Sequence, residues 1–520
     1  MLSANAVVIN GTFYASLCLL ALVFLQKCWY SVRNGHRRHP PSPWSLPVVG
    51  NLFSIPPDMD HIAYVKLGKQ LNTDMISLRL FGYNFLVLNS ARVATEILDK
   101  RSGIYSDRLS TPMIKDPSLL DWGDNAVLLG YGDLWRHYRR MMNNWLNARA
   151  VTQFDDIQEQ RIQPLLHRLV QLQYDSNPFD KVKRAFFYNA ADSMLKLGYG
   201  YTLQGDDDIV FQDMQHTNDH TVRAGMFTNF FVNIFPSLTY VPDWFPGTDW
   251  KRTAREWRAL KERSQSVPYE WTKTQLASGT AEPSILGALL QNHKLVAHLS
   301  EQEKERRLKE VPWMIVAAGT DTTSTALVAF VAAMVLNPHA QAKAQKELDD
   351  ILGPTTLPTM ADRKRLPYIQ NLIQEVLRWQ PVNPTGIAHA CWQDDSYEGY
   401  DIKKGTVVIG NLWAISHDGN VYKDPEIFNP DRFQDPSVPY APAFGWGRRK
   451  CPGIYFAEAS LFIVVASLLA TFTFLKKRDA AGQEIEPKIE PVSNAIIMEL
   501  KPFDFELKLR SAGHRQLIRE

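Results

Sequence analysis

The 520-residue sequence has little cysteine and lacks the signatures of metal-finger and nucleotide-binding proteins. Its cysteines include no C-x-x-C pair and no closely spaced set, which excludes a disulfide framework and a zinc cluster. The four are Cys18, Cys28, Cys391 and Cys451. No complete G-x-G-x-x-G and no P-loop occurs, so we expect no nucleotide or dinucleotide site. With 57 Lys and Arg against 55 Asp and Glu, the net charge of +2 does not favour nucleic acid as a partner.

Internal repeats, low-complexity tracts and a linker inside the main body are also absent, so residues 51–520 are predicted to form one large domain. Helical periodicity dominates between about residues 130 and 380. Strand-like alternation appears at 75–80 and 85–88, and short strands are expected near 400–410 and 495–509. The predicted fold class is mainly α with small β-sheets.

The first 26 residues differ from the rest of the chain. From Ala6 to Gln26 no side chain is charged, and about 20 apolar residues suffice to span a bilayer as a helix. The charged residues that follow at once are all basic: Lys27, Arg33, Arg37 and Arg38. The positive-inside rule then places the remaining chain in the cytosol. We predict a transmembrane anchor at 1–26 and a basic, proline-rich linker at 27–50. A cleaved signal peptide is the alternative, but no small-x-small cleavage site follows the apolar stretch.

The segment from Phe444 to Gly453, FGWGRRKCPG, carries the strongest chemical signal. Gly445 and Gly447 allow a tight turn and a close approach of the backbone to a flat ligand. Cys451 stands just before an apolar helical stretch, and a helix N-terminus together with three neighbouring basic side chains is predicted to lower the pKa of its thiol. A thiolate held in this way is a suitable axial ligand for haem iron. The alternative is a buried structural cysteine after a glycine-rich turn.

Two pairs of residues elsewhere share a helical face. Glu375 and Arg378 are three residues apart, and Trp135 and Arg139 are four apart, so the members of each pair can meet. Without further context, each pair is more typical of a solvated helix surface than of a functional site.

A long apolar run at 311–336 is interrupted by the polar sequence GTDTTST at 319–325. A second transmembrane helix is one interpretation, but an aspartate and several hydroxyls at mid-span are costly in lipid. We therefore predict a long helix through the core of the protein.

The 444–453 segment resembles the haem-binding loop of the cytochrome P450 family, F-x-x-G-x-R-x-C-x-G, and the resemblance extends over nearly the whole chain. It implies a cytochrome P450 fold with haem b as cofactor. Cys451 is implied as the axial ligand of the iron and Arg449 as a partner of a haem propionate. The resemblance implies further cofactor-binding residues: Trp135, Arg139, His389, Phe444, Gly445 and Gly453.

Residues 318–323 resemble the oxygen-binding groove of that family. Gly319 is then expected to leave room for dioxygen, Thr322 to donate a hydrogen bond to the bound oxygen, and Asp321 to supply protons, because splitting the O–O bond to release water consumes two protons. The family's structural triad is implied at Glu375, Arg378 and Arg432.

The implied function is a single-pass, membrane-anchored monooxygenase of the endoplasmic reticulum, with its catalytic domain in the cytosol. It is expected to insert one oxygen atom from O2 into a small apolar organic substrate. The reaction is expected to be a hydroxylation in the biosynthesis of a terpenoid or polyketide-like secondary metabolite of a fungus. Electrons are expected from a separate NADPH-cytochrome P450 reductase at a basic face formed by Arg136, Arg140, Arg448 and Lys450. Aromatic stretches at 230–236 and 240–247 are expected to cover the substrate channel or touch membrane lipid. The alternatives are an O2-independent isomerase or dehydratase and a non-catalytic haem-binding protein.

Overall fold

The structure is a computed structural model that describes residues 38–492 and 496–518. The predicted anchor at 1–26 and the first part of the predicted linker lie outside the described residues. The second part of the linker contacts the body of the protein. The Ser77 N–H donates to the Pro41 carbonyl at 2.9 Å, and the Asp401 N–H donates to the Arg38 carbonyl at 2.7 Å. Backbone hydrogen bonds therefore attach this part of the linker to the domain that follows it in the sequence.

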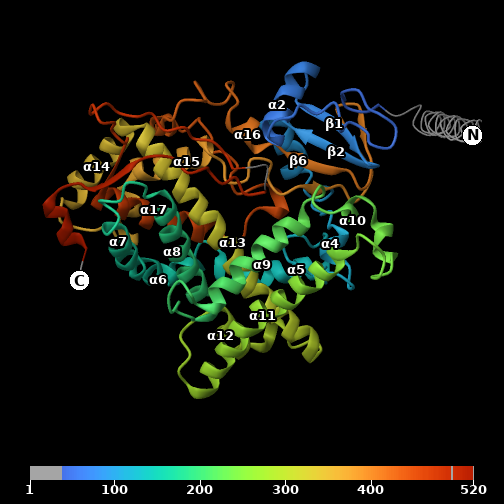
Figure 1. Ribbon diagram of the computed structural model, residues 1–520, viewed down its shortest axis with the longest axis horizontal. Helices are drawn as coiled ribbons and strands as arrows, with labels where there is room; N and C mark the ends of the chain where they lie inside the picture. Colours follow the sequence, from blue (N-terminus) through green and yellow to red (C-terminus); the bar gives the residue numbers. More distant parts are fainter. Residues whose placement is uncertain (1–37, 493–495, 519–520) are drawn as a thin grey trace, which may run out of the picture.

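A four-stranded sheet forms one end of the molecule, at the upper right of Figure 1. Its strand order is β1-β2-β6-β3, with β2 and β6 parallel and the other two pairs antiparallel. The β1–β2 hairpin turns at Phe81 and Gly82, whose φ angles of 47° and 89° suit a two-residue turn. Two further sheets pair β4 with β5 and β7 with β8. The strands are β1 (Met75–Leu80), β2 (Tyr83–Leu88), β3 (His389–Ala390), β4 (Asp395–Tyr397), β5 (Tyr400–Ile402), β6 (Val407–Gly410), β7 (Phe472–Leu475) and β8 (Glu506–Leu509).

Helices form most of the remaining molecule, and the longest of them, α13, crosses its centre (Figure 1). The Ser300 side chain caps α13 by accepting a hydrogen bond from the Glu303 N–H at 3.3 Å. The helices are α2 (Asp60–Leu71), α3 (Ala91–Ala94), α4 (Pro112–Lys115), α5 (Asp133–Leu146), α6 (Asp155–Gln160), α7 (Ile162–Val170), α8 (Phe179–Tyr199), α9 (Ile209–Gly225), α10 (Phe231–Ile234), α11 (Asp249–Ser278), α12 (Ile285–Gln291), α13 (Glu301–Leu336), α14 (Pro338–Leu352), α15 (Pro367–Trp379), α16 (Leu412–Ser416) and α17 (Ile454–Thr471).

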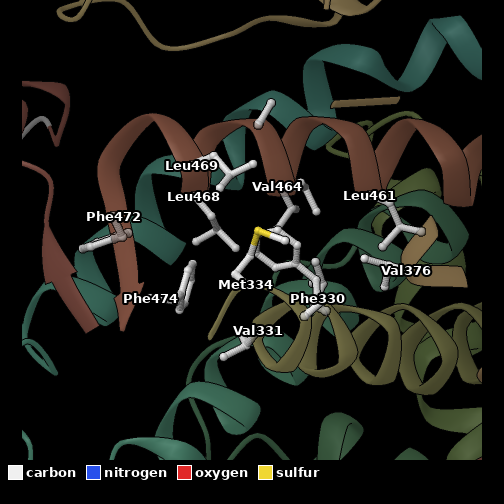
Figure 2. Packing of buried hydrophobic residues seen from close by; sticks show 14 of the residues in the cluster. Phe330, Val331, Met334, Val376, Leu461, Val464, Leu468, Leu469, Phe472 and Phe474 are labelled. Atoms are coloured by element: carbon white, nitrogen blue, oxygen red, sulfur yellow. The ribbon is translucent and has the colours of Figure 1, made fainter. Parts of the chain in front are cut away.

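The main core lies between α13 and α17, as Figure 2 shows. Phe330 and Met334 of α13 point toward Val464 and Leu468 of α17, and all four side chains are buried. The Phe330 ring also packs edge-on against Phe474, with 5.7 Å between the ring centres. Burying a side chain of this size stabilises the fold by roughly 1.5–3 kcal/mol. The apolar sequence of α17 therefore reflects burial on nearly all sides.

The architecture confirms the prediction of a mainly α protein with small sheets. By length and composition α13 and α17 could each cross a membrane, but 72% and 78% of their most apolar windows are buried inside the protein. Burial of this kind is expected of core helices. The apolar helical stretch expected after Cys451 is α17, which ends at Thr471 because Phe472 begins β7.

Candidate active site

Two glycines shape the loop that precedes α17, and a backbone hydrogen bond joins its last residue, Cys451, to its start. Gly445 and Gly447 have φ angles of 75° and 51°, a region that favours glycine. A Cβ on Gly447 would lie 2.5 Å from the carbonyl oxygen of Leu98, so a larger residue would clash with the backbone there. The Cys451 N–H donates to the Phe444 carbonyl at 2.8 Å. These features fix the cysteine just before the first turn of α17.

The Cys451 side chain has a large accessible surface. Even so, protein atoms surround it closely enough that loss of solvation raises the pKa of its thiol. A side chain that is both accessible and enclosed lines an internal space. The Gly453 N–H and Arg139 lower this pKa, in the predicted sense, but burial outweighs them. The prediction of a net lowering is therefore wrong. The surroundings that the protein itself supplies therefore favour the neutral thiol of Cys451 over its thiolate.

The polar break in α13 also carries an accessible surface. Ala318 is exposed at the middle of this core helix, although Ala317 and Thr320 beside it are each only 6% exposed. Thr322 is half-buried, and its hydroxyl donates to the Ala318 carbonyl at 2.7 Å. Residues four apart share a helical face, so Ala318 and Thr322 form one accessible face of α13.

Asp321 lies on the flank of α13 that faces α9, where the Asn218 amide donates a hydrogen bond to its carboxylate. Burial raises the pKa of Asp321 to about 7, with smaller contributions from the charges of Asp219 and Glu499, while Asn218 acts in the opposite direction. A narrow cavity of about 20 Å³ adjoins the carboxylate and has room for about one water. Its polar lining consists of Gln215, Asn218, Thr320 and Asp321. An acid with this pKa can release and take up protons at neutral pH.

Gly319 faces α8. A Cβ at this position would clash with the sulfur of the Met194 side chain, so glycine allows α8 and α13 to pack closely. On this side the space that a side chain would need is already filled by Met194. The family resemblance implied a different role for Gly319, which was to leave room for dioxygen.

Trp135 and Arg139 of α5 meet Arg449 of the cysteine loop. The guanidinium carbons of Arg449 and Arg139 lie 4.4 Å and 5.8 Å from the centre of the Trp135 ring. Arg449 Nε and Nη2 donate to the carbonyls of Ser106 and Leu129, each at 2.7 Å. Burial lowers the pKa of Arg449 to about 10 and also lowers that of Arg139. The enclosure therefore disfavours both positive charges when no anion is near.

Arg108 belongs to the same cluster, although no sequence motif indicated it. Its Nη1 donates to two backbone carbonyls just before His389, and its Nε is buried without a hydrogen bond to any described residue. His389 Nδ1 donates to the Tyr105 carbonyl at 2.7 Å. Burial and the nearby Arg108 keep the pKa of His389 well below its usual range, so the imidazole is neutral. Only the tertiary structure reveals Arg108, because its significance lies in its burial beside Arg449.

These side chains fit a ligand with acidic groups. Among the described residues, Asp107 is the one carboxylate whose charge raises the pKa of Arg108 or Arg449. The Arg139 side chain makes no hydrogen bond or ion pair with a described residue, and the Cys451 group is the charge that raises its pKa. Charges that are partly removed from solvent need partners, so three half-buried guanidinium groups with so little compensation favour an anion beside them. The site thus suits a ligand that offers a metal ion to Cys451 and carboxylates to the arginines.

The sequence model of the family described as "Cytochrome P450" matches residues 40–505. The chain belongs to the cytochrome P450 family. A cytochrome P450 monooxygenase of Armillaria gallica is 35% identical over 512 residues, which cover 97% of this chain and 99% of the relative. Cytochrome P450 monooxygenase COX2 of Coprinopsis cinerea is 35% identical over 495 residues, covering 94% and 92%. Cytochrome P450 monooxygenase 208 of Postia placenta is 37% identical over 517 residues, covering 97% and 96%. Family membership implies a haem cofactor and makes this chain an oxidoreductase.

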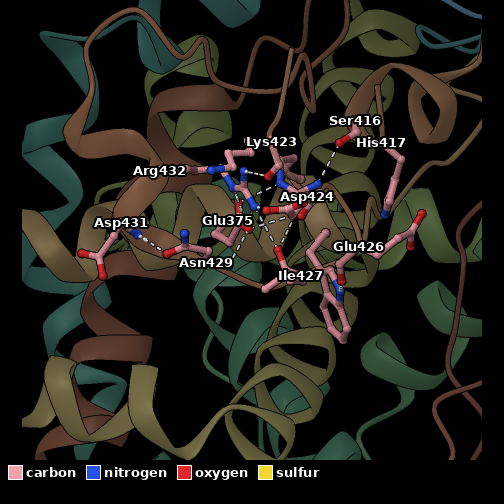
Figure 3. Close-up of polar contacts among 12 residues, drawn as sticks. Glu375, Ser416, His417, Lys423, Asp424, Glu426, Ile427, Asn429, Asp431 and Arg432 are labelled. Carbon is pink, nitrogen blue, oxygen red and sulfur yellow. Dashed lines mark hydrogen bonds and ion pairs between the residues drawn. The ribbon is translucent and has the colours of Figure 1, made fainter. Parts of the chain in front are cut away.

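In this cytochrome P450, Glu375, Arg378 and Arg432 meet in a buried ion cluster. Figure 3 shows Glu375 and Arg432 of this cluster with their hydrogen-bond partners. The Glu375 carboxylate accepts from Arg378 Nε and Nη2 at 2.7 and 2.9 Å, from Arg432 Nε at 3.0 Å, and from the Asn429 N–H at 2.8 Å. Arg378 Nη1 in turn donates to the Ser416 carbonyl at 2.8 Å. The cluster thus joins α15 to the 416–432 segment that leads toward the cysteine loop.

The residues of the expected basic face and the aromatic segment at 230–247 both include exposed side chains, as their expected roles at the surface require. The four residues of the expected basic face are all exposed: Arg136, Arg140, Arg448 and Lys450. Phe231, Tyr240 and Trp244 are 76%, 88% and 81% exposed. This aromatic segment contacts the β1–β2 hairpin through Phe235, whose ring centre lies 6.1 Å from that of Phe81.

Proposed function

We propose that this cytochrome P450 binds haem b between the accessible face of α13 and the cysteine loop, with Cys451 as the axial ligand of the iron. The observation that carries the proposal is a thiol that is accessible but enclosed, in a protein region that also holds three half-buried, poorly compensated guanidinium groups. The alternative of a structural cysteine does not explain this accessibility. Phe444 and Gly453 bound the loop around the thiol, and Gly445 has open space where a side chain would be.

The haem propionates would be held by Trp135, Arg139, Arg449 and His389, with Arg108 added by the structure. Charge-assisted hydrogen bonds from arginine to carboxylate are strong and directed. Two propionate charges would offset the uncompensated positive charge of the cluster. They would also accept hydrogen bonds from the side-chain N–H groups of Arg139 and Arg108 that have no acceptor among the described residues.

Thr322 and Asp321 would deliver protons to the site. When bound, the haem supplies the iron at which dioxygen is reduced and one oxygen atom is transferred to the substrate. Asp321 holds a proton at its carboxylate near neutral pH and can exchange it with a water in the adjoining cavity. Thr322 Oγ1 can accept a hydrogen bond while it donates to the Ala318 carbonyl, so it can orient a second water on the accessible face. This pair supports a monooxygenase over an O2-independent isomerase or dehydratase, because only oxygen reduction to water consumes protons in this way.

The substrate would be a small apolar organic molecule, and the reaction a hydroxylation in the biosynthesis of a terpenoid or polyketide-like secondary metabolite. The support is the similarity to fungal cytochrome P450 monooxygenases over nearly the full chain.

An NADPH-cytochrome P450 reductase would supply electrons at the exposed basic face that contains Arg136, Arg140, Arg448 and Lys450. We propose a single-pass orientation in the endoplasmic reticulum with the catalytic domain in the cytosol. The exposed aromatic side chains of the 230–247 segment would lie against membrane lipid beside the anchor.

The decisive experiment compares Cys451→Ala with Cys391→Ala. Cys391 is also a free cysteine, but it is buried in the packing beside the four-stranded sheet. The wild type and Cys391→Ala should give the red-shifted Soret band of a thiolate-ligated haem when reduced under carbon monoxide, and Cys451→Ala should not. Survival of that band in Cys451→Ala would refute the ligand assignment. Product formation under strict anaerobiosis, without peroxide, would refute the monooxygenase itself.

A further inference from the structure

The loop at residues 116–131, between α4 and α5, is fastened to the rest of the protein at three places. Near its start, α11 holds it: Arg258 Nη1 donates to the Pro117 carbonyl and Lys261 Nζ to the Asp121 carbonyl, each at 2.9 Å. Near its end, Arg449 Nη2 donates to the Leu129 carbonyl at 2.7 Å. The loop therefore supplies one of the two carbonyls that orient the Arg449 guanidinium.

The middle of the 116–131 loop is fastened by Glu310 of α13. This carboxylate is 2% exposed and accepts three hydrogen bonds. Trp122 Nε1 donates at 2.8 Å, the Ala126 N–H at 3.0 Å, and Gln265 Nε2 of α11 at 2.9 Å. Two of the three donors belong to the loop. Neither the cysteine loop nor the proton-delivery residues use Glu310, so its burial needs another explanation.

We propose that Glu310 is a positioning residue that holds the 116–131 loop against α13 and thereby keeps the Leu129 carbonyl in place for Arg449. The consequence for haem rests on the proposed function, whereas the attachment of the loop does not. Glu310 makes no contact with the reacting groups and acts through the loop.

Consecutive turns carry this constraint along the loop from Trp122 to Leu129. The Asn125 N–H donates to the Trp122 carbonyl at 3.2 Å, and the Leu129 N–H donates to the Asn125 carbonyl at 2.8 Å. The Asn125 side chain, 2% exposed, also accepts from the Val127 N–H at 3.1 Å. The segment between Glu310 and Arg449 is thus a hydrogen-bonded unit, and movement at Trp122 would displace Leu129.

Charged and titratable groups face Glu310 from every neighbouring element. They are Asp124 of the loop with its ion-pair partner Arg306, Lys261 of α11, Tyr138 of α5 and Tyr199 of α8. Burial, and then Asp124, raise the pKa of Glu310 to about 7, while Trp122, Ala126 and Lys261 act in the opposite direction. If the loop detached, water would reach the carboxyl and its pKa would fall toward the usual range. The attached state therefore binds the proton more tightly, and attachment weakens as the pH rises toward and through about 7.

The test measures amide hydrogen exchange of the loop in the holoenzyme, together with the rate at which haem transfers to an apomyoglobin acceptor. Glu310→Ala removes the acceptor of all three donors. We expect amides in 122–129 to exchange at least about tenfold faster, which corresponds to about 1.4 kcal/mol, and haem to transfer several-fold faster. Val311→Ala is the matched control, because it leaves a small cavity at the next buried position of α13 without removing an acceptor. It should leave both rates near those of the wild type.

The pH profile separates positioning from a general packing role. In the wild type, loop exchange corrected for its intrinsic rate should rise between pH 5 and 8, with a midpoint near the pKa of about 7. Glu310→Gln cannot titrate and should give a flat profile, while Val311→Ala should keep the wild-type profile. Unchanged loop exchange in Glu310→Ala, or equal loosening of α8 and α13, would overturn the proposal. Faster loop exchange without faster haem transfer would overturn the link to Arg449. If the wild type bound no haem through Cys451, the proposed function would fail, but the exchange experiment would still decide the role of Glu310.

Discussion

Removal of Glu375 should be among the most destabilising single changes in this protein. Glu375 and Arg378 are fully buried, and the Arg432 side chain is 6% exposed. Glu375→Ala would leave both guanidinium groups in the interior with only carbonyl acceptors, among them those of Ser416 and Ile427. Breaking a buried ion pair by removing one partner costs about 3–5 kcal/mol. Since a domain is stable by only about 5–15 kcal/mol, the change would remove a large share of the total.

The matched control is an ion pair on the surface. Lys346 and Asp350 of α14 lie 2.6 Å apart with side chains 72% and 59% exposed. Solvent screens such a pair, so Asp350→Ala should cost at most about 0.5 kcal/mol. The two contacts have similar lengths, but Glu375 is buried and compensates two guanidinium groups, whereas Asp350 is exposed and pairs with one lysine.

The measurement is the free energy of unfolding of the detergent-solubilised protein in urea, by linear extrapolation of far-ultraviolet circular dichroism. Glu375→Ala should unfold at a much lower urea concentration than Asp350→Ala, and should lose haem in the same transition. Equal stabilities of the two variants would refute the argument that the buried cluster holds the 416–432 segment to α15.

The remaining predictions concern the proton pathway and the anchor. Thr322→Ala should keep haem ligation but divert electrons from NADPH into hydrogen peroxide; the loss of product should be at or below the low end of the roughly 10²–10⁴-fold typical of acid–base groups, because water can replace the hydroxyl. Wild-type coupling of product to NADPH would remove Thr322 from the mechanism. Asn218→Leu removes a hydrogen bond that lowers the pKa of Asp321, so that pKa should rise above about 7. Asp321 would then stay protonated to higher pH, and the high-pH limb of the coupling profile should move upward; an unmoved limb would contradict this role. Deletion of residues 1–26 should release the protein from membranes at least in part while haem is retained, and sedimentation with the Soret band as readout would expose a failure of either expectation.

The chemistry of the site could be predicted from sequence where it depends on residues close together in the chain. The glycines and Cys451 lie within ten residues, and their order fixes a tight turn before a helix. Glu375 and Arg378 share a helical face by spacing alone, as do Trp135 and Arg139. The apolar run around Asp321 and Thr322 predicted a core helix, and α13 is one.

Tertiary structure decided everything that depends on burial or on contacts between distant segments. Arg108, Asn218 and Glu310 carry no local signal, since each acquires its role from a partner about one hundred or more residues away. The Gly453 N–H at the start of α17 lowers the pKa of Cys451 as the sequence predicted, and Arg139, which the sequence did not indicate, acts in the same direction, yet burial reverses the net shift. The physical reason is that loss of solvation depends on all the atoms packed around a group, and the sequence shows only its neighbours along the chain.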